Sequence, residues 1–517
     1  MNAIELSIFA SRIEAVCDEM GAVLQRTAFS PNIKDRLDYS CAVFDAGGEL
    51  CAQAAHIPVH LGSMAYAMRG IVREVDWSPG DMVILNDPFL GGTHLPDVTL
   101  IAPLHVAGER VGFIANRAHH ADIGASMPGS MPISRRLDEE GLIIPPSHLL
   151  RAGKLDEAML QHIAGVTANP QQSRGDFAAQ ISANRTGLAR LRALVEGMDK
   201  AKAGRGVAAY EDGLQQLNDY AERLAQSALS AIPDGEYHFG DWMDDDGCGN
   251  TDLPIKVSLH VSGHHIRVDF VGTAAQTTGN INCPLSVAAA GVYYAFRCLM
   301  PAHTPAASGS FRSIDIHAPE GCLLNARRPA AVAAGNVETS TRVVDVVLGA
   351  LTQALPDTIV AASHGSMNNL AMGSRVAGSE WDYYETMGGG MGAGPRGPGL
   401  SAVQTHMTNT LNTPIEVLES HYPLRIRRYA LRAGSGGAGR YPGGDGLIRE
   451  FEFLAPTTVT LLTERRRHAP WGLQNGGDGA VGLNLRNDDG LPPKVSYEAQ
   501  AGERLTVETP GGGGWGS

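Results

Sequence analysis

The stretch DMVILNDPFLGGTHLPDVTLIAPL, residues 81–104, contains two short apolar runs on either side of a polar turn. The run MVIL has the length and the branched side chains of a buried strand, and VTLIAPL predicts a second strand. A third run, RVGFIANRAHH at 110–120, follows after the short connection AGE and is expected to pair with the second. His94 and Asp97 lie in the polar turn, which makes this end of the strands a candidate site.

Segments on either side of this unit predict both helices and strands. Residues 3–27 repeat apolar side chains at steps of three and four, which is typical of a helix with one buried face. The segment AVFDAGGELCAQ, 42–53, predicts a hairpin that turns at Gly47 and Gly48. Two leucine stripes on either side of AGRG, 203–206, predict a helical hairpin.

The rest of the chain is expected to be rich in strands. IKVSLHVSGHHIRVDFVG, 255–272, alternates on both sides of its turn and predicts a hairpin, whereas 281–300 and 340–355 predict helices. Glycines cluster in MGGGMGAGPRGPG, GSGGAGRYPGGDG and TPGGGGWG, which by themselves read as flexible loops. We therefore expect an α+β fold in three parts: an N-terminal mixed α/β region over 1–182 that carries the candidate site, a helical hairpin over 183–232, and a β-rich region with glycine loops over 233–517.

The composition argues against several classes of protein. The chain has 41 basic and 55 acidic residues and a formal net charge of −14, which disfavours nucleic acid as a partner. Its first residues lack the pattern of a signal peptide, and no run of about 18 apolar residues indicates a transmembrane helix. Seven scattered cysteines without a CxxC pair are typical of reduced thiols. These features predict a globular cytoplasmic protein that is not associated with a membrane.

The polar turn combines residue types that bind metals or transfer protons. His94 and Asp97 are three residues apart, and Pro96 between them prevents a regular helix, so the pair is expected in a turn. His119 or His120 could supply a third side chain. Because successive residues of a strand face opposite sides, only one of these two histidines should face the site.

Two readings of this cluster are open from spacing alone. Two imidazoles and one carboxylate with an open coordination position suit Zn²⁺, Mn²⁺ or Fe²⁺ in a catalytic site. The alternative is an ordinary polar loop in which histidine and aspartate cap strands and turns, because HxxD…H is a loose pattern. Other acids that could complete the shell or act as bases are Asp38, Asp87, Asp122 and Glu140.

Other chemical motifs are absent from the sequence or weak. There is no GxxxxGK[ST] loop and no GxGxxG after a strand, so no nucleotide-binding loop is predicted. DWMDDDGCGNTD, 241–252, lacks the ligand spacing of a calcium loop and is interpreted as a solvated turn. ERRRHAPWG, 464–472, is interpreted as a solvated basic face, with a site for an anion or an acidic partner as the alternative.

Separated stretches of the chain, taken together, resemble the hydantoinase B/oxoprolinase family. The resemblance runs from near residue 4 to the end of the sequence. Its motifs, in order, are SPNIKDRLDYSCAVFD, HIPVHLGSM, GDMVILNDPFLGGTHLPDVTLIAPL, RAHHADIGA, EGLIIPPSHL, AAGNVETSTRVVDVVLGAL, GSMNNLAMG, YYETMGGGMGA, THMTNT, PIEVLESHYPLRIRRYALR and TPGGGGWG. The resemblance implies that the glycine clusters are ordered loops of the β-rich half.

The resemblance also implies a function, a partner and a cofactor. The family comprises large subunits of ATP-dependent amidohydrolases and of acetone- and acetophenone-type carboxylases. It implies a second subunit of the hydantoinase A type, which has an actin-like fold and consumes ATP, in a heterotetramer of two A and two B subunits. It further implies one divalent metal in this chain, zinc or manganese. The family's ligands match His94, Asp97 and His119 rather than His120, and Asp38 is the implied fourth ligand.

We therefore expect the B subunit of an ATP-dependent cyclic amidohydrolase of the hydantoinase, 5-oxoprolinase or lactamase type. The partner phosphorylates a lactam or imide oxygen, and metal-bound hydroxide in this chain then attacks the ring carbon. Asp87, Asp122 or Glu140 could carry the proton. The alternatives are a subunit of an ATP-dependent ketone carboxylase, a non-catalytic scaffold for the ATPase subunit, and a stand-alone metallohydrolase.

Overall fold

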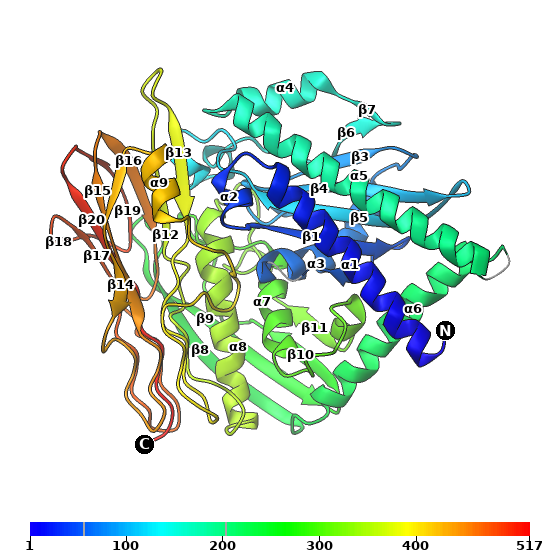
Figure 1. The fold of residues 1–517 in the computed structure, drawn as a ribbon. Coiled ribbons are helices and arrows are strands. Elements are labelled where there is room, and N and C mark those ends of the chain that lie inside the picture. The colour runs from blue at the N-terminus through cyan, green and yellow to red at the C-terminus, as the bar shows by residue number, and fades with distance from the viewer. Residues whose placement is uncertain (55–56, 202–203) are drawn as a thin grey trace.

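The computed structural model describes residues 1–54, 57–201 and 204–517. Figure 1 shows a sheet with helices on both sides at the upper right, a second sheet with helices below it, and paired sheets of C-terminal residues at the left. Helices and strands alternate along most of the chain, and several separate sheets are formed. This arrangement confirms the expected α+β class.

The N-terminal sheet carries the candidate site. Its seven strands, counted over the described residues, run in the order β2-β1-β5-β4-β3-β6-β7, and each neighbouring pair is antiparallel. Other parts of the chain cover both faces of the sheet, and apolar side chains of its strands point to both faces. The strands are β1 (Tyr39–Asp45), β2 (Leu50–Gln53), β3 (Met82–Leu85), β4 (Asp97–Val106), β5 (Glu109–His119), β6 (Ser147–Arg151) and β7 (Lys154–Leu155).

Helices cover both faces of this sheet (Figure 1). α1 (Ala3–Thr27) and α5 (Pro170–Ala201) pack on one face, and α3 (Pro58–Glu74) packs on the other. α1 begins with a capping box in which the Asn2 and Glu5 side chains each accept the other's backbone N–H. Its buried residues recur at the predicted steps of three and four: Phe9, Ile13, Val16, Cys17, Met20, Gly21 and Leu24. Two short helices lie beside this layer, α2 (Pro31–Lys34) and α4 (Glu157–Gly165).

α5 and α6 (Gly206–Leu229) form the predicted helical hairpin. Residues 202–203 of its predicted connection lie outside the described residues. α5 is longer than expected, since it begins at Pro170 and packs along β4 and β5. The boundary proposed between residues 182 and 183 therefore falls inside a helix that belongs to the N-terminal layer. The division of the chain into three regions stays a prediction.

A second sheet lies below the first in Figure 1, with strands in the order β11-β10-β9-β8. β9 and β10 form the predicted antiparallel hairpin, and β10 pairs with β11 in parallel. The two predicted helices are present: α8 packs on β8 and β9, and α7 packs between α8 and α3. The elements are β8 (Gly235–Asp245), β9 (Thr251–Ser262), β10 (His265–Asp269), α7 (Leu285–Arg297), β11 (Ile314–His317) and α8 (Ser340–Ala354).

The C-terminal residues form two more sheets with an apolar layer between them. One has the order β13-β12-β16-β19 and the other β14-β15-β20-β17-β18. Side chains of both sheets, such as Leu370 and Phe451, belong to one buried cluster. The elements are β12 (Asn369–Ser374), β13 (Trp381–Glu385), α9 (Ile415–His421), β14 (Leu424–Arg432), β15 (Gly446–Phe453), β16 (Thr457–Leu462), β17 (Leu483–Arg486), β18 (Asp489–Gly490), β19 (Lys494–Ala499) and β20 (Arg504–Glu508).

The glycine-rich loops of this half are ordered, and they pack backbone against backbone. The N–H of Gly512 donates to the carbonyl oxygen of Gly444, and the N–H of Gly444 donates to that of Met391. A Cβ atom added at Gly444 would lie 1.9 Å from the carbonyl oxygen of Leu400, and one at Gly512 would lie 2.1 Å from that of Met391. Only glycine permits such close approach. Flexible loops, the reading from composition alone, are wrong, and the ordered loops implied by the family resemblance are confirmed.

Replacing Gly444 by alanine is expected to lower the free energy of unfolding by roughly 1–3 kcal/mol, because the added methyl group forces the paired loops apart. The matched control is Gly397→Ala in a neighbouring loop, where an added Cβ meets no atom within 4 Å. That variant should stay within about 0.5 kcal/mol of the native chain. Urea unfolding of the three proteins measures both effects, and equal midpoints for all three would contradict the close packing.

Two charged runs that read as solvated segments are buried against each other in part. Asp244 and Arg465 have no exposed surface. The Asp244 carboxylate accepts the N–H of Arg466 at 2.6 Å, and Nη2 of Arg465 donates to Oδ2 of Asp241 at 2.7 Å. The solvated interpretations are wrong for these residues, because each run supplies the opposite charges and hydrogen bonds that the other needs for burial. Arg467 and Asp252 remain exposed.

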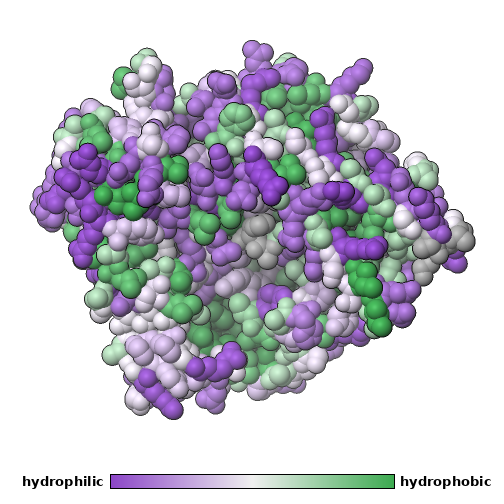
Figure 2. Space-filling view, in the orientation of Figure 1, coloured by the Kyte–Doolittle hydropathy of each residue, from purple (hydrophilic) through white to green (hydrophobic). Residues whose placement is uncertain are grey.

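Exposed apolar side chains are dispersed over the surface. Ile4 and Ile8 on α1 and Leu431 on β14 are each more than half exposed, at 74%, 51% and 56%. On the face shown in Figure 2, hydrophobic residues are interspersed with hydrophilic ones, as is usual for protein surfaces. Within the described residues, no helix is both long and apolar enough to cross a membrane.

Candidate metal centre

The candidate site lies at the open end of the β4–β5 hairpin. Asp97 is the first residue of β4 and His119 is the last residue of β5, and the two are paired directly across the strands. Residues paired in this way lie side by side, so their side chains leave the sheet together. His94 lies in the preceding turn, where its carbonyl oxygen accepts the N–H of Asp97 at 3.1 Å. The turn therefore brings these three residues to one place.

Three side chains of metal-ligand type converge there. One donor atom from each of His94, Asp97 and His119 lies within 4.8 Å of the other two, and all three residues are buried. The two imidazole rings meet edge to face, with centroids 5.2 Å apart. We call these residues the triad; they are the three that the family resemblance singled out.

His120 lies outside the triad. Its Nε2 is 3.0 Å from Oε1 of Gln180, and its ring stacks on Phe177 of α5 with centroids 4.3 Å apart. Neighbours along a strand face opposite sides of the sheet. The two histidines therefore face opposite sides of the sheet, His119 toward the triad and His120 toward α5.

The atoms of the triad that face one another lack protein partners. Nε2 of His119, both ring nitrogens of His94 and Oδ1 of Asp97 are buried without a hydrogen bond to any described residue. Nε2 of His94 approaches Oδ1 of Asp97 to 3.2 Å, but the two are not aligned as donor and acceptor. Buried polar atoms almost always have a partner. The group therefore fits a bound divalent cation, and two imidazoles with one carboxylate suit Zn²⁺ or Mn²⁺.

The carboxylate of Asp97 is held ionised and in one orientation. Its Oδ2 accepts the hydroxyl of Thr93 at 2.7 Å and the Nδ2 amide of Asn336 at 3.3 Å, and it lies 3.2 Å from Nε2 of His60. Burial by itself would raise the pKa of Asp97, but the charges of the adjacent His94 and His60 bring it well below its ordinary value. Oδ2 is thus occupied by protein partners, and Oδ1 is left for a ligand.

The ring of His119 is fixed from two sides. It stacks on Tyr384 with centroids 4.5 Å apart, and its Nδ1 lies 3.1 Å from Nδ2 of Asn32. If the Asn32 amide is turned so that its oxygen accepts Nδ1–H, the lone pair of Nε2 faces the triad. Burial keeps the pKa of His119 well below its ordinary value. The ring is therefore neutral, which is the state that a metal ligand requires.

His60 is a residue of the candidate site that the sequence did not single out. It lies on α3, and besides its contact with Asp97 its Nδ1 is 3.4 Å from Oγ of Ser40. The signal was present in HIPVHLGSM, one of the stretches that carry the family resemblance. Nothing in the spacing connected that stretch with the turn at 94–97, because only the packing of α3 on the sheet brings them together. His56 of the same stretch lies outside the described residues.

Asp38, the implied fourth ligand, lies beside the triad but is not one of its three converging residues. Its carbonyl oxygen accepts the N–H of His119 at 3.0 Å, and its carboxylate lies 3.9 Å from Nη2 of Arg36. Burial raises the pKa of Asp38, which the charges of Arg36 and His60 counteract in part. A role for Asp38 as a ligand stays a prediction.

Two of the three candidate proton carriers are engaged elsewhere. Asp87 accepts the N–H of Phe89 at 3.0 Å and is paired with Arg328, so it holds the turn after β3. Asp122 accepts two backbone N–H groups and the hydroxyl of Ser130. Neither carboxylate has an oxygen left without a partner, which weakens both as candidates.

Glu140, the third candidate, keeps one free oxygen. Its Oε1 accepts the Ser134 hydroxyl at 2.7 Å and the N–H groups of Val332 and Ala333 at 2.8 and 3.0 Å. Its Oε2 is buried and has no partner among the described residues. Burial raises the pKa of Glu140 to about 7, although these hydrogen bonds and the charge of His94 oppose the rise. A carboxyl group with that pKa can gain and lose a proton near neutral pH.

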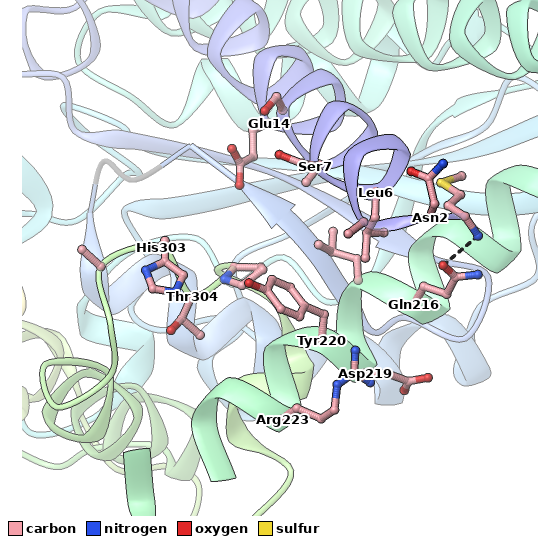
Figure 3. A pocket seen from close by; sticks show the side chains of 17 residues that line it. Asn2, Leu6, Ser7, Glu14, Gln216, Asp219, Tyr220, Arg223, His303 and Thr304 are labelled. Atoms are coloured by element: carbon pink, nitrogen blue, oxygen red, sulfur yellow. Dashed lines mark hydrogen bonds between the residues drawn. The ribbon is translucent and has the colours of Figure 1, made fainter. Parts of the chain in front are cut away.

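A cavity lies away from this centre, near the N-terminus. It has a volume of about 720 Å³ and lies between α1, α6 and the segment 302–305. Figure 3 shows Glu14, Arg223 and His303 around it, with the N-terminal amine bonded to Gln216 at 2.9 Å. These polar groups are spread along its walls and do not converge on one point, so its size does not make it a candidate for the chemistry.

A protein-family model matches almost the whole chain. The model of hydantoinase B/oxoprolinase covers residues 2–517. The chain belongs to the hydantoinase B/oxoprolinase family. A similar member is 5-oxoprolinase 1 of Arabidopsis thaliana, 39% identical over 549 residues that include 100% of this chain and 42% of the plant protein. This hydantoinase B/oxoprolinase chain thus spans about two fifths of that relative's length.

Solved structures share the fold of this hydantoinase B/oxoprolinase member. The crystal structure of ATP-dependent caprolactamase from Pseudomonas jessenii matches with a TM-score of 0.89 at 27% identity, covering 100% of this chain and 91% of that chain. A nucleotide-free structure of acetone carboxylase matches with a TM-score of 0.87 at 16% identity, covering 100% and 76%. The second likeness shows the fold alone. The family resemblance and the mixed fold expected from the sequence are confirmed.

Proposed function

We propose that this chain is the B subunit of an ATP-dependent cyclic amidohydrolase, which opens the ring of an activated lactam or imide. The observation that carries the proposal is the triad of buried, unpaired donor atoms from His94, Asp97 and His119. Membership of the family and the likeness to the caprolactamase support the reaction class. ATP would be used by a separate hydantoinase A-type subunit, in a heterotetramer of two A and two B subunits.

The residues around the triad suggest which group performs each part of the proposed reaction. A zinc or manganese ion held by the triad would supply Lewis acidity, which lowers the pKa of water and polarises an acyl oxygen. His60 and Thr93 hold Asp97 in place for this role. We propose Oε2 of Glu140 as the proton carrier: it takes a proton from the attacking water and returns one to the ring nitrogen as the C–N bond breaks. Burial of the whole group excludes bulk water from the site.

We expect the purified chain, equilibrated with zinc or manganese, to hold about one metal ion and His94→Ala to lose it, because removal of one of three protein ligands leaves too few donors. His120→Ala is the matched control, since His120 bonds Gln180 and lies outside the triad. That variant should keep its metal. Elemental mass spectrometry measures all three proteins, and equal metal content in the native chain and His94→Ala would contradict the assignment.

Reconstitution tests the reaction class. The full chain is combined with an A-type subunit, ATP and a panel of cyclic amides, and ring-opened product that requires ATP and both subunits would support the proposal. Bicarbonate-dependent consumption of a ketone would identify a carboxylase instead. Turnover without ATP or partner would identify a stand-alone metallohydrolase. If turnover were unchanged with the metal-free His94→Ala variant, this chain would act only as a scaffold for the ATPase subunit.

A further inference from the structure

A π-helix lies between the metal centre and the C-terminal sheets. It spans Gly335–Thr339, directly before α8, and all of its residues are buried. The π-helix is a rare element that is found frequently at functional sites. Nδ2 of Asn336, on this helix, donates to Oδ2 of Asp97 at 3.3 Å, so the helix already holds one residue of the triad. Glu338 is the second polar side chain that needs a reason for its complete burial.

Glu338 contacts the start of β12. Its Oε1 accepts the N–H of Met367 at 2.9 Å and Nδ2 of Asn369 at 2.7 Å. Nδ2 of Asn369 also donates to the carbonyl oxygen of Leu462 at 3.0 Å. Because a carbonyl oxygen can only accept, these bonds fix which end of the Asn369 amide carries its nitrogen. The amide oxygen of Asn369 is therefore directed to its other neighbour.

That neighbour is Tyr384 of β13, whose hydroxyl donates to Oδ1 of Asn369 at 2.6 Å. The ring of Tyr384 lies on the ring of His119, with the two planes 5° apart and the centroids 4.5 Å apart. Stacking sets the distance between two rings but lets them slide over each other, so the hydroxyl bond fixes where the Tyr384 ring lies. Two hydrogen bonds and one ring stack thus connect Glu338 with His119 of the triad.

The carboxyl group of Glu338 acts in this chain as an uncharged acceptor. Its Oε2 is buried and has no partner among the described residues. Burial and the charge of Glu464 raise the pKa of Glu338 to about 8, so the group is largely neutral at pH 7. Glutamine is therefore a close mimic of this side chain, because its amide oxygen can accept the same two bonds, whereas alanine removes the acceptor.

We propose that Glu338 is a positioning residue of the metal centre. It holds the ring of His119 in place through Asn369 and Tyr384, as Asn336 of the same π-helix holds another residue of the triad directly. Glu338 touches no substrate and moves no proton in this role. The inference rests on the proposed metal centre, but the contact between Tyr384 and His119 that it explains is a property of the metal-free chain.

Metal affinity measures the effect, with zinc as the probe and a chelator of known affinity as the competitor. We expect Glu338→Ala to bind zinc about 10–100-fold more weakly than the native chain, which is typical when a residue that orients a metal ligand is removed. Glu338→Gln keeps the acceptor and should bind zinc like the native chain. Tyr384→Phe keeps the ring and removes only the hydroxyl, and it should lose about tenfold in affinity.

The adjacent tyrosine supplies the matched control. Tyr383 is also buried on β13, but neighbouring residues of a strand face opposite sides, and its ring lies 5.1 Å from that of Tyr422. Tyr383→Phe should bind zinc like the native chain. Loss of a hydroxyl from this strand would affect both tyrosine variants if its role were only structural. If Glu338→Ala does not fold, Tyr384→Phe carries the same test.

The ring of His119 is also followed without metal. In NMR spectra of the metal-free chain with labelled histidine, the Cε1 proton of His119 should be shifted upfield by the ring current of Tyr384. The signal is assigned by its loss in His119→Gln. We expect the upfield shift to shrink in Glu338→Ala and Tyr384→Phe, and to return in Glu338→Gln.

Three results would overturn the inference. They are an unchanged His119 signal in folded Glu338→Ala, equal losses of zinc affinity in Tyr383→Phe and Tyr384→Phe, and a Glu338→Gln variant as weak as Glu338→Ala. The two measurements separate this inference from the proposed function. If the His119 signal depends on Glu338 but the native chain binds no zinc, the metal centre alone is overturned. If all variants bind zinc as the native chain does, the role of Glu338 alone is overturned.

Discussion

Replacing Glu140 by glutamine is expected to reduce reconstituted, ATP-dependent turnover by about 10²–10⁴-fold, the usual contribution of a positioned acid or base. Glutamine keeps the shape of the side chain and the Oε1 acceptor that Ser134, Val332 and Ala333 bond. It removes only the ability of the second oxygen to gain and lose a proton. Metal content and folding should therefore stay unchanged while the rate falls, which separates proton transfer from metal binding.

The adjacent acid supplies the control for this experiment. Glu139 is exposed, and its Oε2 accepts the N–H of Arg135 at 2.8 Å, away from the triad. Glu139→Gln should turn over at the native rate. An undiminished rate for Glu140→Gln, with metal bound, would remove Glu140 from the mechanism and return the role to Asp87 or Asp122.

Replacing Arg465 by methionine is expected to lower the free energy of unfolding by about 3–5 kcal/mol, which is typical when one partner of a buried ion pair is removed. Arg465 is fully buried, and its Nη2 donates to Asp241 at 2.7 Å and to Asp345 at 2.5 Å. Methionine fills much of the volume but leaves two carboxylates buried without this counter-charge. Urea unfolding followed by circular dichroism measures the loss.

The same basic run contains the matched control. Arg467 pairs with Asp252 at 3.0 Å, but the two side chains are 49% and 42% exposed, so water and salt screen the pair. Arg467→Met should change the free energy of unfolding by no more than about 1 kcal/mol. If both variants lost the same stability, the burial of Arg465 would not be the cause.

Local features of the sequence were sufficient to predict most of the helices and strands around the site. The helix over 3–27, the hairpin at Gly47 and Gly48 and the pairing of the two strands that follow the turn at 94–97 were all predicted and are present. Each of these predictions depends on the spacing of apolar and turn-forming residues over a short stretch of sequence. Hydrophobic periodicity shows this spacing directly. The extent of α5 was underestimated, because its first residues are polar and owe their helical state to packing on β4 and β5.

The site was predictable only in part. The sequence narrowed the third candidate ligand to one of two adjacent histidines, and the family resemblance implied His119. The sequence did not point to His60. It also did not separate Glu140 from Asp87 and Asp122 as candidate proton carriers, because the three carboxylates differ only in that Glu140 keeps one oxygen without a partner. That difference arises from backbone N–H groups of Val332 and Ala333, almost two hundred positions further along the chain.

By itself, then, the sequence determined the antiparallel unit at 81–120, the alternation that divides His119 from His120, and the family to which the chain belongs. Tertiary structure alone decided which charges are buried together, why the glycine loops are ordered, and that α3 brings His60 to Asp97. The physical reason is that periodicity records which face of an element is apolar but not which distant element covers it. The burial of each group in the site depends on which distant element covers it. The pKa and the hydrogen-bond partners of the group follow from that burial.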